Sequence, residues 1–538
     1  MPGMPDKNKT RINGYMTVYL TLTMTVLLSL CLTLIEGARS SAIKLESEIA
    51  VSIASDSIMA EYNRELFRQY NIFAIEDSYG TDHAAISNID EHLANYMTKN
   101  LSGDDIFLGR FFYRDFLGLS VENAKTEKAM YLTDYDGRVF KRRAYEVIKD
   151  DIGLTAMKEL VEYANVIEAR GFDDQGLTDR MYGLQSELDS AQRKACEEKK
   201  KEAEEAKKRR EEKAREREAD KAEQKEDGEE GDDKPEESEA YDELDEEISE
   251  VHEPYNPASD AIARMNPLLL YQYVENVNDL SENIINTSEL LSGRKRAGKI
   301  STGNLELEEE GIVETGIEKF AFREYLMRYM GNYLNVDKED ALRYQIEYVI
   351  GGMDADIDNL VAVVGMINAI RFVESYLYIQ GDDEKKAGAK VLATVIAVYT
   401  YTEEFIDQYT ELILLVWACA EAQHDVKCLL AGSRIEPFKN SDNWFTTLPN
   451  ILDPIAMENT DGDESGLRYE DFLRTFMLVL PDKIVTTRAM DIIESDVRLT
   501  EGNKEFRMDS CVDTVELMIS TYSSFGYENN FRVRKRYE

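Results

Sequence analysis

The longest uninterrupted apolar stretch of the chain runs from Tyr15 to Ile35 and contains no charged residue. At about 1.5 Å of rise per residue a helix of this length crosses a bilayer, so the pattern predicts a transmembrane helix over residues 15–35. Three basic residues precede it, at Lys7, Lys9 and Arg11. Because basic flanks stay in the cytoplasm, we expect residues 1–14 to be cytoplasmic and the body to lie outside the cell membrane.

A cleaved signal peptide is the alternative interpretation of the same segment. It shares the basic start, and small residues between Ala38 and Ala42 offer cleavage sites. The apolar region of a signal peptide is usually about 7–15 residues long, which is shorter than this stretch. The pattern therefore favours a retained single-pass anchor, and both interpretations export the body of the protein.

The region after the span keeps a helical composition. No proline occurs between residues 6 and 234, and Gly37 is the only glycine between residues 14 and 80. Helix is therefore predicted to continue from the membrane into a stalk over residues 36–75. Three apolar residues at i+4 spacing form a stripe along this stalk: Leu45, Ile49 and Ile53. We expect a membrane-rooted helix of about fifty residues that docks into a head domain.

Residues 76–184 carry mixed patterns and predict a mixed α/β part of the head. Aromatic residues are concentrated at 107–116, and residues 120–133 have the composition of a strand. Tyr135-Asp136-Gly137 is a turn signal, after which residues 141–149 return to a helical pattern.

Residues 185–253 form a charged insert. In residues 185–224 several Glu residues stand four positions before Lys or Arg, a pattern that supports a solvated helix. The apolar positions of this segment are mostly alanine, which argues against a heptad coiled coil. Residues 226–250 hold fifteen acids and one lysine. A segment with so little apolar content cannot build a core, so we expect it to be disordered.

Residues 254–538 are mainly helical in pattern and predict an α-rich head. The strongest helical segments are Asp260–Asn283, Glu318–Leu334, Asp356–Ile379 and Lys386–Leu430. Residues 343–350 (RYQIEYVI) have the composition of a strand. Residues 411–420 raise the question of a second span, but the apolar stretch is too short and charges flank it, so a buried core helix is predicted. The expected fold class is mainly α (α+β) on a single N-terminal transmembrane helix.

Composition narrows the choice of partner and compartment. The net charge is −43, from 106 acidic and 63 basic residues, and such a surface repels the phosphates of nucleic acids. The five cysteines are scattered and no CxxC pair occurs. A disulfide framework and a thiolate zinc site are therefore not expected, so the exported body must be held by its core.

The N-terminal line resembles a known group of proteins. A basic start, a long apolar span and a closing IEGAR at residues 35–39 are similar to TadE/TadG-like proteins of Tad (Flp) pilus systems. The longer stretches GYMTVYLTLTMTVLLSLCLTLIEGARSSAIKLESE and AEYNRELFRQYNIFAIEDSYG resemble a more specific group, uncharacterised membrane-anchored proteins encoded with Tad-type pilus or secretion genes in Gram-positive anaerobes. Three later segments resemble the same group: residues 347–352 (EYVIGG), 414–432 (LLVWACAEAQHDVKCLLAG) and 467–477 (LRYEDFLRTFM). This resemblance implies a pilus-associated context and carries over no catalytic or binding residue.

One departure from the type IV prepilin pattern separates this chain from a processed pilin subunit. Prepilins are cut after a glycine and carry glutamate at the fifth mature position. Cleavage after Gly14 would make Tyr15 the first residue and Tyr19 the fifth. The resemblance therefore implies a TadG-like anchored accessory protein.

The sharpest local motif is the first half of an EF-hand calcium loop. Asp461, Asp463 and Ser465 occupy positions one, three and five, with a glycine at position six. Phe472 stands at position twelve, where the loop needs a bidentate acid, and the acids Glu470 and Asp471 come too early. A plain turn before a helix is the favoured interpretation, so no metal and no other cofactor is predicted.

Other chemistry leaves little signal. The four histidines have no zinc-binding spacing, and no Gly-x-Ser-x-Gly, Walker loop or HExxH occurs. Trp417 and Trp444 are expected to pack in or at the edge of the core. The basic tail Arg532–Arg536 has three possible contacts, anionic lipid, cell wall or the acidic surface of the protein itself, and the sequence does not choose among them.

These observations predict a noncatalytic, membrane-anchored extracytoplasmic component of a Tad-type pilus or secretion apparatus. The expected partners are the membrane and other pilus or secretion proteins, with no nucleic acid and no small-molecule substrate. Two alternatives stay open: an envelope adhesin or calcium-dependent binding module, and a cell-wall hydrolase whose paired carboxylates would leave no sequence signature.

Overall fold

The computed structural model describes residues 14–102, 117–149, 174–224, 273–274, 280–294, 303–304, 316–336, 340–451, 457–460 and 466–537. The chain forms two compact units. Unit 1 consists of Met1–Asp151, Asn286–Tyr325 and Thr486–Glu538, and unit 2 of Ile152–Ile285 and Leu326–Val485. Each unit therefore draws on segments that lie far apart in the sequence.

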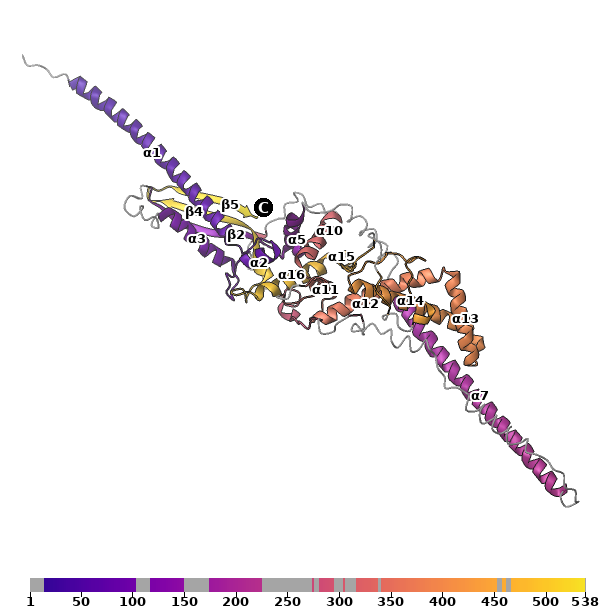
Figure 1. Cartoon of the computed structure of the whole chain (residues 1–538). Helices are drawn as coiled ribbons and strands as arrows, with labels where there is room; N and C mark the ends of the chain where they lie inside the picture. Colours follow the sequence, from indigo (N-terminus) through magenta and orange to yellow (C-terminus); the bar gives the residue numbers. More distant parts are fainter. Residues whose placement is uncertain are drawn as a thin grey trace, which may run out of the picture. The chain divides into compact units, whose positions relative to one another are not determined.

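Unit 1 begins with α1 (Gly14–Met59), one continuous helix of 46 residues (Figure 1). Its apolar first part is exposed along its whole length, and its second part packs against a sheet. The side chains that α1 buries all follow residue 42: Ile43, Ser47, Ala50, Val51, Ala54, Ser55 and Ile58. The predicted long N-terminal apolar helix is confirmed, and the same helix forms part of the core of unit 1.

The stripe predicted along the stalk faces outward. Leu45, Ile49 and Ile53 are 57%, 45% and 46% exposed, so α1 does not dock through this row. The row that contacts the sheet contains Ser47, Ala50 and Ala54, whose small side chains let the helix backbone approach the strands closely. The i+4 spacing of apolar residues predicts one face of the helix, but it does not determine which face packs on the sheet.

The predicted helical stalk over residues 36–75 is interrupted. After α1 ends at Met59, Asn63 caps α2 (Arg64–Tyr70) by accepting from the N–H groups of Glu65 and Leu66. Asn71, at φ 54°, ends α2 in the left-handed conformation, and the chain then enters β1 (Ile75–Glu76). The capping residues Asn63 and Asn71 thus limit α2 to seven residues, although the composition of the whole segment favours helix.

The sheet of unit 1 is built around its C-terminal strand. β4 (Cys511–Ser523) pairs antiparallel with β1, with β2 (Leu119–Tyr131) and with β5 (Glu528–Arg536), while β3 (Gly303–Asn304) pairs parallel with β2. α1 and α3 (Ile86–Ser102) pack on one face of this sheet. The core between them is aliphatic, and β4 contributes Val512, Val515, Leu517 and Ile519.

The mixed patterns after residue 117 were predicted correctly. β2 covers the expected strand, and α5 (Asp134–Ile148) covers the expected helix. Tyr135, Asp136 and Gly137 have φ angles of 55°, 57° and 81°, so the turn signal is confirmed inside the first turn of α5. A Cβ at Gly137 would lie 2.5 Å from the Thr486 side chain, so glycine is required there for space as well as for conformation. The aromatic residues 107–116 lie outside the described residues.

Unit 2 is a bundle of helices around α14 (Ile406–Leu430), which packs against α12 (Asp356–Ile379) and α13 (Asp383–Tyr399). α12 has the predicted bounds, and residues 411–420 form a buried helix as expected. The predicted single helix over 386–430 is divided, because Tyr401 adopts a φ of 58° between α13 and the 3₁₀ turn η5 (Glu403–Phe405). Unit 2 also contains η6 (Leu448–Asn450) and α15 (Tyr469–Val479). The elements η4 (Thr287–Glu289) and η8 (Met508–Ser510) belong to unit 1, as does most of α10 (Gly316–Tyr329) and of α16 (Asp482–Arg498).

The predicted strand over residues 343–350 is a helix. α11 (Gln345–Gly351) ends at Gly352, which caps it with φ 74° and donates its N–H to the carbonyl of Tyr348. Every side chain from Gln345 to Ile350 is buried. A short apolar run buried on all sides has no periodicity that separates helix from strand, and here the two glycines act as a helix end.

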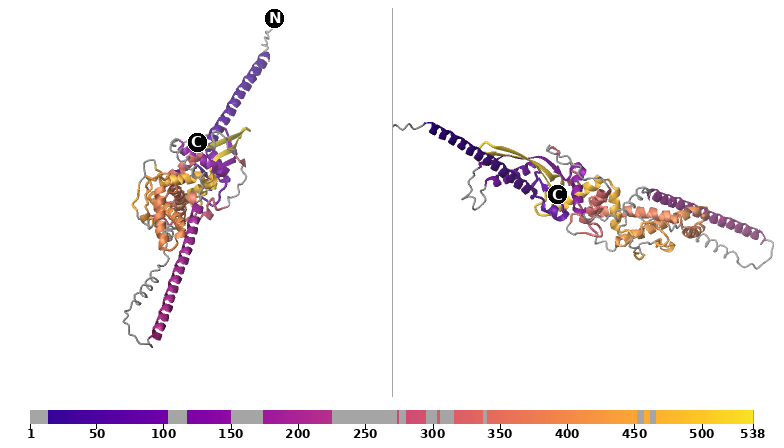
Figure 2. Two further views of the ribbon diagram at one scale, coloured as in Figure 1. Left: turned by 90° about the vertical axis from the view of Figure 1, so that its right-hand side faces the viewer. Right: turned by 90° about the horizontal axis from the view of Figure 1, so that it is seen from above.

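The charged helix of the insert is α7 (Asp174–Gln224), and it begins eleven residues before the predicted start at Gln185. Its first turns pack into unit 2 through Met181 and Leu188, whereas residues 197–216 bury no side chain. Figure 2 shows α7 as one long straight helix. Glu205 and Arg209 form one of the expected i,i+4 pairs at 3.6 Å. The acidic segment 226–250 and most of the helix predicted over 260–283 lie outside the described residues.

Among the described helices, α1 and α12 are long and apolar enough to cross a membrane. The apolar window of α1 is not buried at all, whereas half of that of α12 is buried in unit 2. α12 therefore has the character of a core helix, and α1 is compatible with a membrane anchor or a signal peptide.

Candidate functional site

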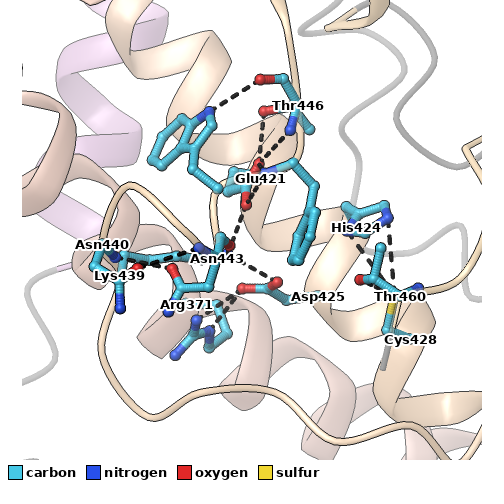
Figure 3. A network of polar contacts seen from close by, with 12 residues as sticks. Arg371, Glu421, His424, Asp425, Cys428, Lys439, Asn440, Asn443, Thr446 and Thr460 are labelled. Carbon is cyan, nitrogen blue, oxygen red and sulfur yellow. Dashed lines mark hydrogen bonds and ion pairs between the residues drawn. The ribbon is translucent and has the colours of Figure 1, made fainter. Parts of the chain in front are cut away.

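Two acidic side chains lie inside the apolar helix α14. Glu421 and Asp425 are one turn apart and are 0% and 2% exposed. An ionised carboxylate in an apolar interior is unstable unless a cation and hydrogen bonds compensate it. The surroundings of these two residues therefore form the first candidate for a functional site in unit 2 (Figure 3).

Arg371 of α12 and Lys439 supply the compensating charges. The Nε and Nη2 atoms of Arg371 lie 2.9 and 2.8 Å from Asp425 Oδ2. Lys439 Nζ donates to Glu421 Oε1 at 2.6 Å and to Asp425 Oδ1 at 2.9 Å. It also donates to the carbonyl of Asn443 at 3.1 Å. Two cations thus balance two anions, and we call Arg371, Glu421, Asp425 and Lys439 the α14 ion network.

Glu421 also holds the polypeptide that follows α14. Its Oε2 accepts from the backbone N–H and the hydroxyl of Thr446 at 2.8 and 2.7 Å, and its Oε1 accepts from the N–H of Phe445 at 3.1 Å. The indole of Trp417 donates to the same Thr446 hydroxyl at 3.0 Å. Every oxygen of the two carboxylates therefore has a partner, so the network fastens this loop onto the helix and leaves no oxygen for a substrate.

The electrostatics of the network agree with that interpretation. Burial would raise the pKa of Asp425, but the ammonium of Lys439 and the guanidinium of Arg371 outweigh it and hold this pKa below its ordinary value. A proton acceptor for catalysis needs a pKa near the working pH. The lowered pKa and the contacts with Arg371 and Lys439 therefore fit Asp425 as a counter-ion and not as a proton acceptor.

The same helix also carries His424, directly before Asp425, and Cys428 one turn further on. Cys428 Sγ is 3.9 Å from Nδ1 and 3.8 Å from Nε2 of His424, and it accepts from the N–H of Thr460 at 3.4 Å. Burial opposes ionisation of both groups, yet their mutual contact raises the pKa of His424 and lowers the pKa of Cys428. Both side chains are 0% exposed. A nucleophile must reach a substrate, so this pair fits a polar contact of the interior better than a catalytic dyad.

Another buried carboxylate belongs to the EYVIGG segment in α11. Glu347 Oε1 accepts from the N–H of Tyr333 at 2.9 Å and from the hydroxyl of Tyr469 at 2.7 Å. Its Oε2 is buried without a hydrogen-bond partner among the described residues. Burial raises the pKa of Glu347 to about 7, against the hydrogen bonds from Tyr333 and Tyr469, which favour the ionised form. Among the causes of this pKa shift in the described part of the chain there is no cation that would stabilise the ionised form.

The predicted calcium loop is described only at its end, since Asp461, Asp463 and Ser465 lie outside the described residues. Asp471 Oδ2 accepts from the N–H of Arg468 at 2.9 Å and so caps α15. Glu470 stands beside it in the same first turn. Phe472 is 0% exposed, which makes position twelve a core position. In the described parts of the chain no group of three His, Cys, Asp or Glu residues is arranged to hold a metal ion.

Two further groups from the sequence, a described histidine and the basic tail, have structural partners. His92 Nδ1 lies 3.0 Å from Glu61. The basic tail forms β5, where Arg532 Nε contacts Glu516 at 2.6 Å and Lys535 contacts Asp56 at 2.6 Å. Of the three contacts left open for this tail, the acidic surface of the protein itself is the one that the structure contains.

Sequence reasoning missed the α14 ion network. A signal was present, because an acidic residue recurs at i+4 within the apolar stretch of residues 412–430. Such charges on an otherwise apolar helix indicate buried ion pairs. The cations were not predictable, because Arg371 and Lys439 lie 54 and 14 positions from Asp425 along the chain.

Comparison with known families gives one match. Residues 247–523 match the model of a family of unknown function, DUF5702, and this segment contains the α14 ion network, α11 and β4. No curated protein and no solved structure matches the chain. The match covers just over half of the 538 residues. The chain belongs to the DUF5702 family.

Proposed function

We propose that this protein is a noncatalytic, membrane-anchored extracytoplasmic component of a Tad-type pilus or secretion apparatus, with the role of a TadG-like accessory protein. The observation that supports this proposal most is that α1 combines an exposed apolar part with a part that is buried in unit 1. Its first part is apolar and wholly exposed, and its second part belongs to the core of unit 1. Because one continuous helix joins both parts, a force or displacement in the membrane would reach the sheet directly.

The orientation follows from the residues before α1. Lys7, Lys9 and Arg11 would hold residues 1–14 in the cytoplasm, so that both units would face the outside of the cell. None of the five cysteines, all of which are described, forms a disulfide in the structure. The buried ion pairs and the aliphatic cores would therefore stabilise the exported body without disulfides.

The outward stripe of α1 supports an assembly role. Leu45, Ile49 and Ile53 remain about half exposed although the opposite side of the same turns is buried. Covering such side chains contributes on the order of 1 kcal/mol each, which suits a second helix that leaves the membrane beside α1. A neighbouring small-pilin or platform helix is the partner that this geometry fits.

Site-specific photo-cross-linking tests this proposal. In a full-length Cys31→Ser background, Ile49→Cys and Ile53→Cys place a thiol on the stripe, and Lys44→Cys places one on an exposed polar position of the same helix. Each thiol is labelled with a benzophenone maleimide and irradiated in intact membranes. We expect the Ile49→Cys and Ile53→Cys variants to become joined to a second protein encoded with the pilus genes, and the Lys44→Cys variant to remain unjoined. Equal adducts at all three positions, or no adduct at any, contradict a helix partner on this stripe.

The two alternatives have a weaker basis in the described residues. The ligand positions of a calcium loop, Asp461, Asp463 and Ser465, are not described, and Phe472 is buried at its twelfth position. Paired carboxylates for a hydrolase occur as Glu421 and Asp425, whose oxygens are all occupied. Neither arrangement gives the adhesin or the hydrolase a specific observation of its own.

A further inference from the structure

The hairpin between β4 and β5 lies beside the point where α1 leaves its apolar stretch. The hydroxyl of Tyr527 donates to Glu36 Oε1 at 2.6 Å. The guanidinium carbon of Arg39 lies 4.1 Å from the centre of the Phe525 ring, and Arg39 also forms an ion pair with Glu36 at 2.8 Å. These contacts hold the tip of the hairpin against the first turn that follows Ile35.

This position is set by rigid local structure. Ser523 donates its N–H to the carbonyl of Tyr527 at 2.8 Å, and Gly526 donates back to the carbonyl of Ser523 at 2.8 Å. Gly526 has φ 85°, as a tight hairpin with a bulge requires. The tip also joins the start of β2, because the N–H of Ser524 donates to the carbonyl of Gly118 at 2.8 Å. Three chain segments thus fix the tip relative to α1.

The level of the tip follows from helix geometry. Glu36 and Arg39 are one and four residues beyond the apolar stretch, which is at most about 6 Å along the axis of α1. If residues 15–35 span the bilayer, the tip lies at the depth of the lipid headgroups on the outer side. From there β4 and β5 run away from the bilayer beside the second part of α1, since Lys535 and Tyr537 contact Asp56 and Met59 near its end.

The chemistry of the tip suits this environment. Phe525 and Tyr522 are 45% and 44% exposed. Exposing two aromatic rings to water near one turn does not stabilise the fold, and exposed apolar side chains that lie together are typical of an interaction surface. Aromatic side chains are enriched at membrane interfaces because an apolar ring and a polar edge are both accommodated there. Arg39 beside the Phe525 ring adds a cation at the level of the phosphates, and Glu36 balances its charge within the protein.

We propose that the β4–β5 hairpin tip is a lipid-contacting foot, in which Phe525 and Tyr522 enter the headgroup region of the outer leaflet. The proposal rests on the membrane anchoring proposed above and extends it. With α1 alone, unit 1 would be free to tilt about the point where the helix emerges. A second contact beside α1 limits that tilt and presents the outward stripe of α1 to a neighbour at a defined height.

Depth-dependent quenching tests the foot. Full-length protein carrying Phe525→Trp is reconstituted in phosphatidylcholine vesicles whose acyl chains are brominated close to the headgroup, and the emission of the two native tryptophans in wild type is subtracted. Met518→Trp is the matched control, because Met518 is 41% exposed on the same strand. It lies five residues before Ser523, about 17 Å along the strand. Tyr522→Trp provides a second probe near the tip.

We expect the brominated lipid to quench the added tryptophan at 525 and 522 several times more strongly than the one at 518, with emission shifted to the blue. Equal quenching at 525 and 518 in protein that floats with the vesicles overturns the foot and leaves the anchor intact. Protein that does not float with the vesicles removes the anchor, and the foot with it.

Discussion

Replacing Lys439 with methionine is expected to destabilise unit 2 by about 3–5 kcal/mol. The change removes the cation that Glu421 and Asp425 share. Both carboxylates stay buried, and the guanidinium of Arg371, which contacts Asp425, is the one cation of the network that remains. The uncompensated charge, rather than the lost contact, causes most of the effect. Urea unfolding of the full chain in mild detergent measures it through tryptophan fluorescence, because Trp417 and Trp444, the only tryptophans of the chain, both lie in unit 2.

Two variants control this measurement. Lys390→Met removes an exposed lysine whose ammonium lies 3.4 Å from Asp407, and it should change the free energy of unfolding by less than about 0.5 kcal/mol. The double variant Lys439→Met/Glu421→Gln restores the balance of charge, so it should be more stable than Lys439→Met alone. If the Lys439→Met protein is as stable as the Lys390→Met protein, the charge of Lys439 contributes little to the free energy of unfolding, and the prediction is wrong.

The second large effect is a dependence of stability on pH that originates in Glu347. Burial raises the pKa of this carboxyl group to about 7 in the folded chain, whereas an unfolded glutamate titrates near its ordinary value of 4.5. Between these two values the folded state holds the proton and the unfolded state does not. The contribution of Glu347 to stability is therefore complete below about pH 4.5 and is lost as pH rises to about 7, by about 3 kcal/mol in total.

Glu347→Gln isolates this contribution. Glutamine keeps an acceptor for Tyr469 and the backbone of Tyr333 but cannot ionise. We expect the variant to lose the decline of stability between pH 5 and 8 and to be more stable than wild type at pH 8. Glu404→Gln, at an exposed glutamate of the same unit, is the matched control and should leave the pH profile unchanged. A Glu347→Gln profile that runs parallel to wild type contradicts a buried carboxyl with this pKa.

Long or sharply bounded patterns could be predicted from the sequence. The uncharged stretch after Tyr15 lies in a helix, the strand composition of residues 120–133 corresponds to β2, and α12 has the predicted bounds Asp356 to Ile379. For β2 and α12 the local signal and the tertiary environment require the same structure, and the exposed first part of α1 follows from its local signal alone. An element is predictable from one sequence when its local pattern and its packing in the fold favour the same structure.

Other features depended on contacts between segments far apart in the chain. Whether Leu45 or Ala50 faces the sheet is decided by how closely β4, more than 450 residues later, approaches α1. α11 was mistaken for a strand because a helix buried on every side has no polar face. The α14 ion network was overlooked because its cations come from α12 and from the loop after α14, which no local pattern connects.

Affinity capture of full-length protein from detergent-solubilised membranes tests the central claim most directly. The protein would carry a C-terminal tag, and mass spectrometry would identify both its own N-terminal peptides and the proteins bound to it. An anchored assembly component predicts peptides from the Met1 side of the chain together with pilus or secretion proteins. A captured chain that begins between Ala38 and Ala42, with no such proteins bound, would contradict the account and indicate a secreted protein.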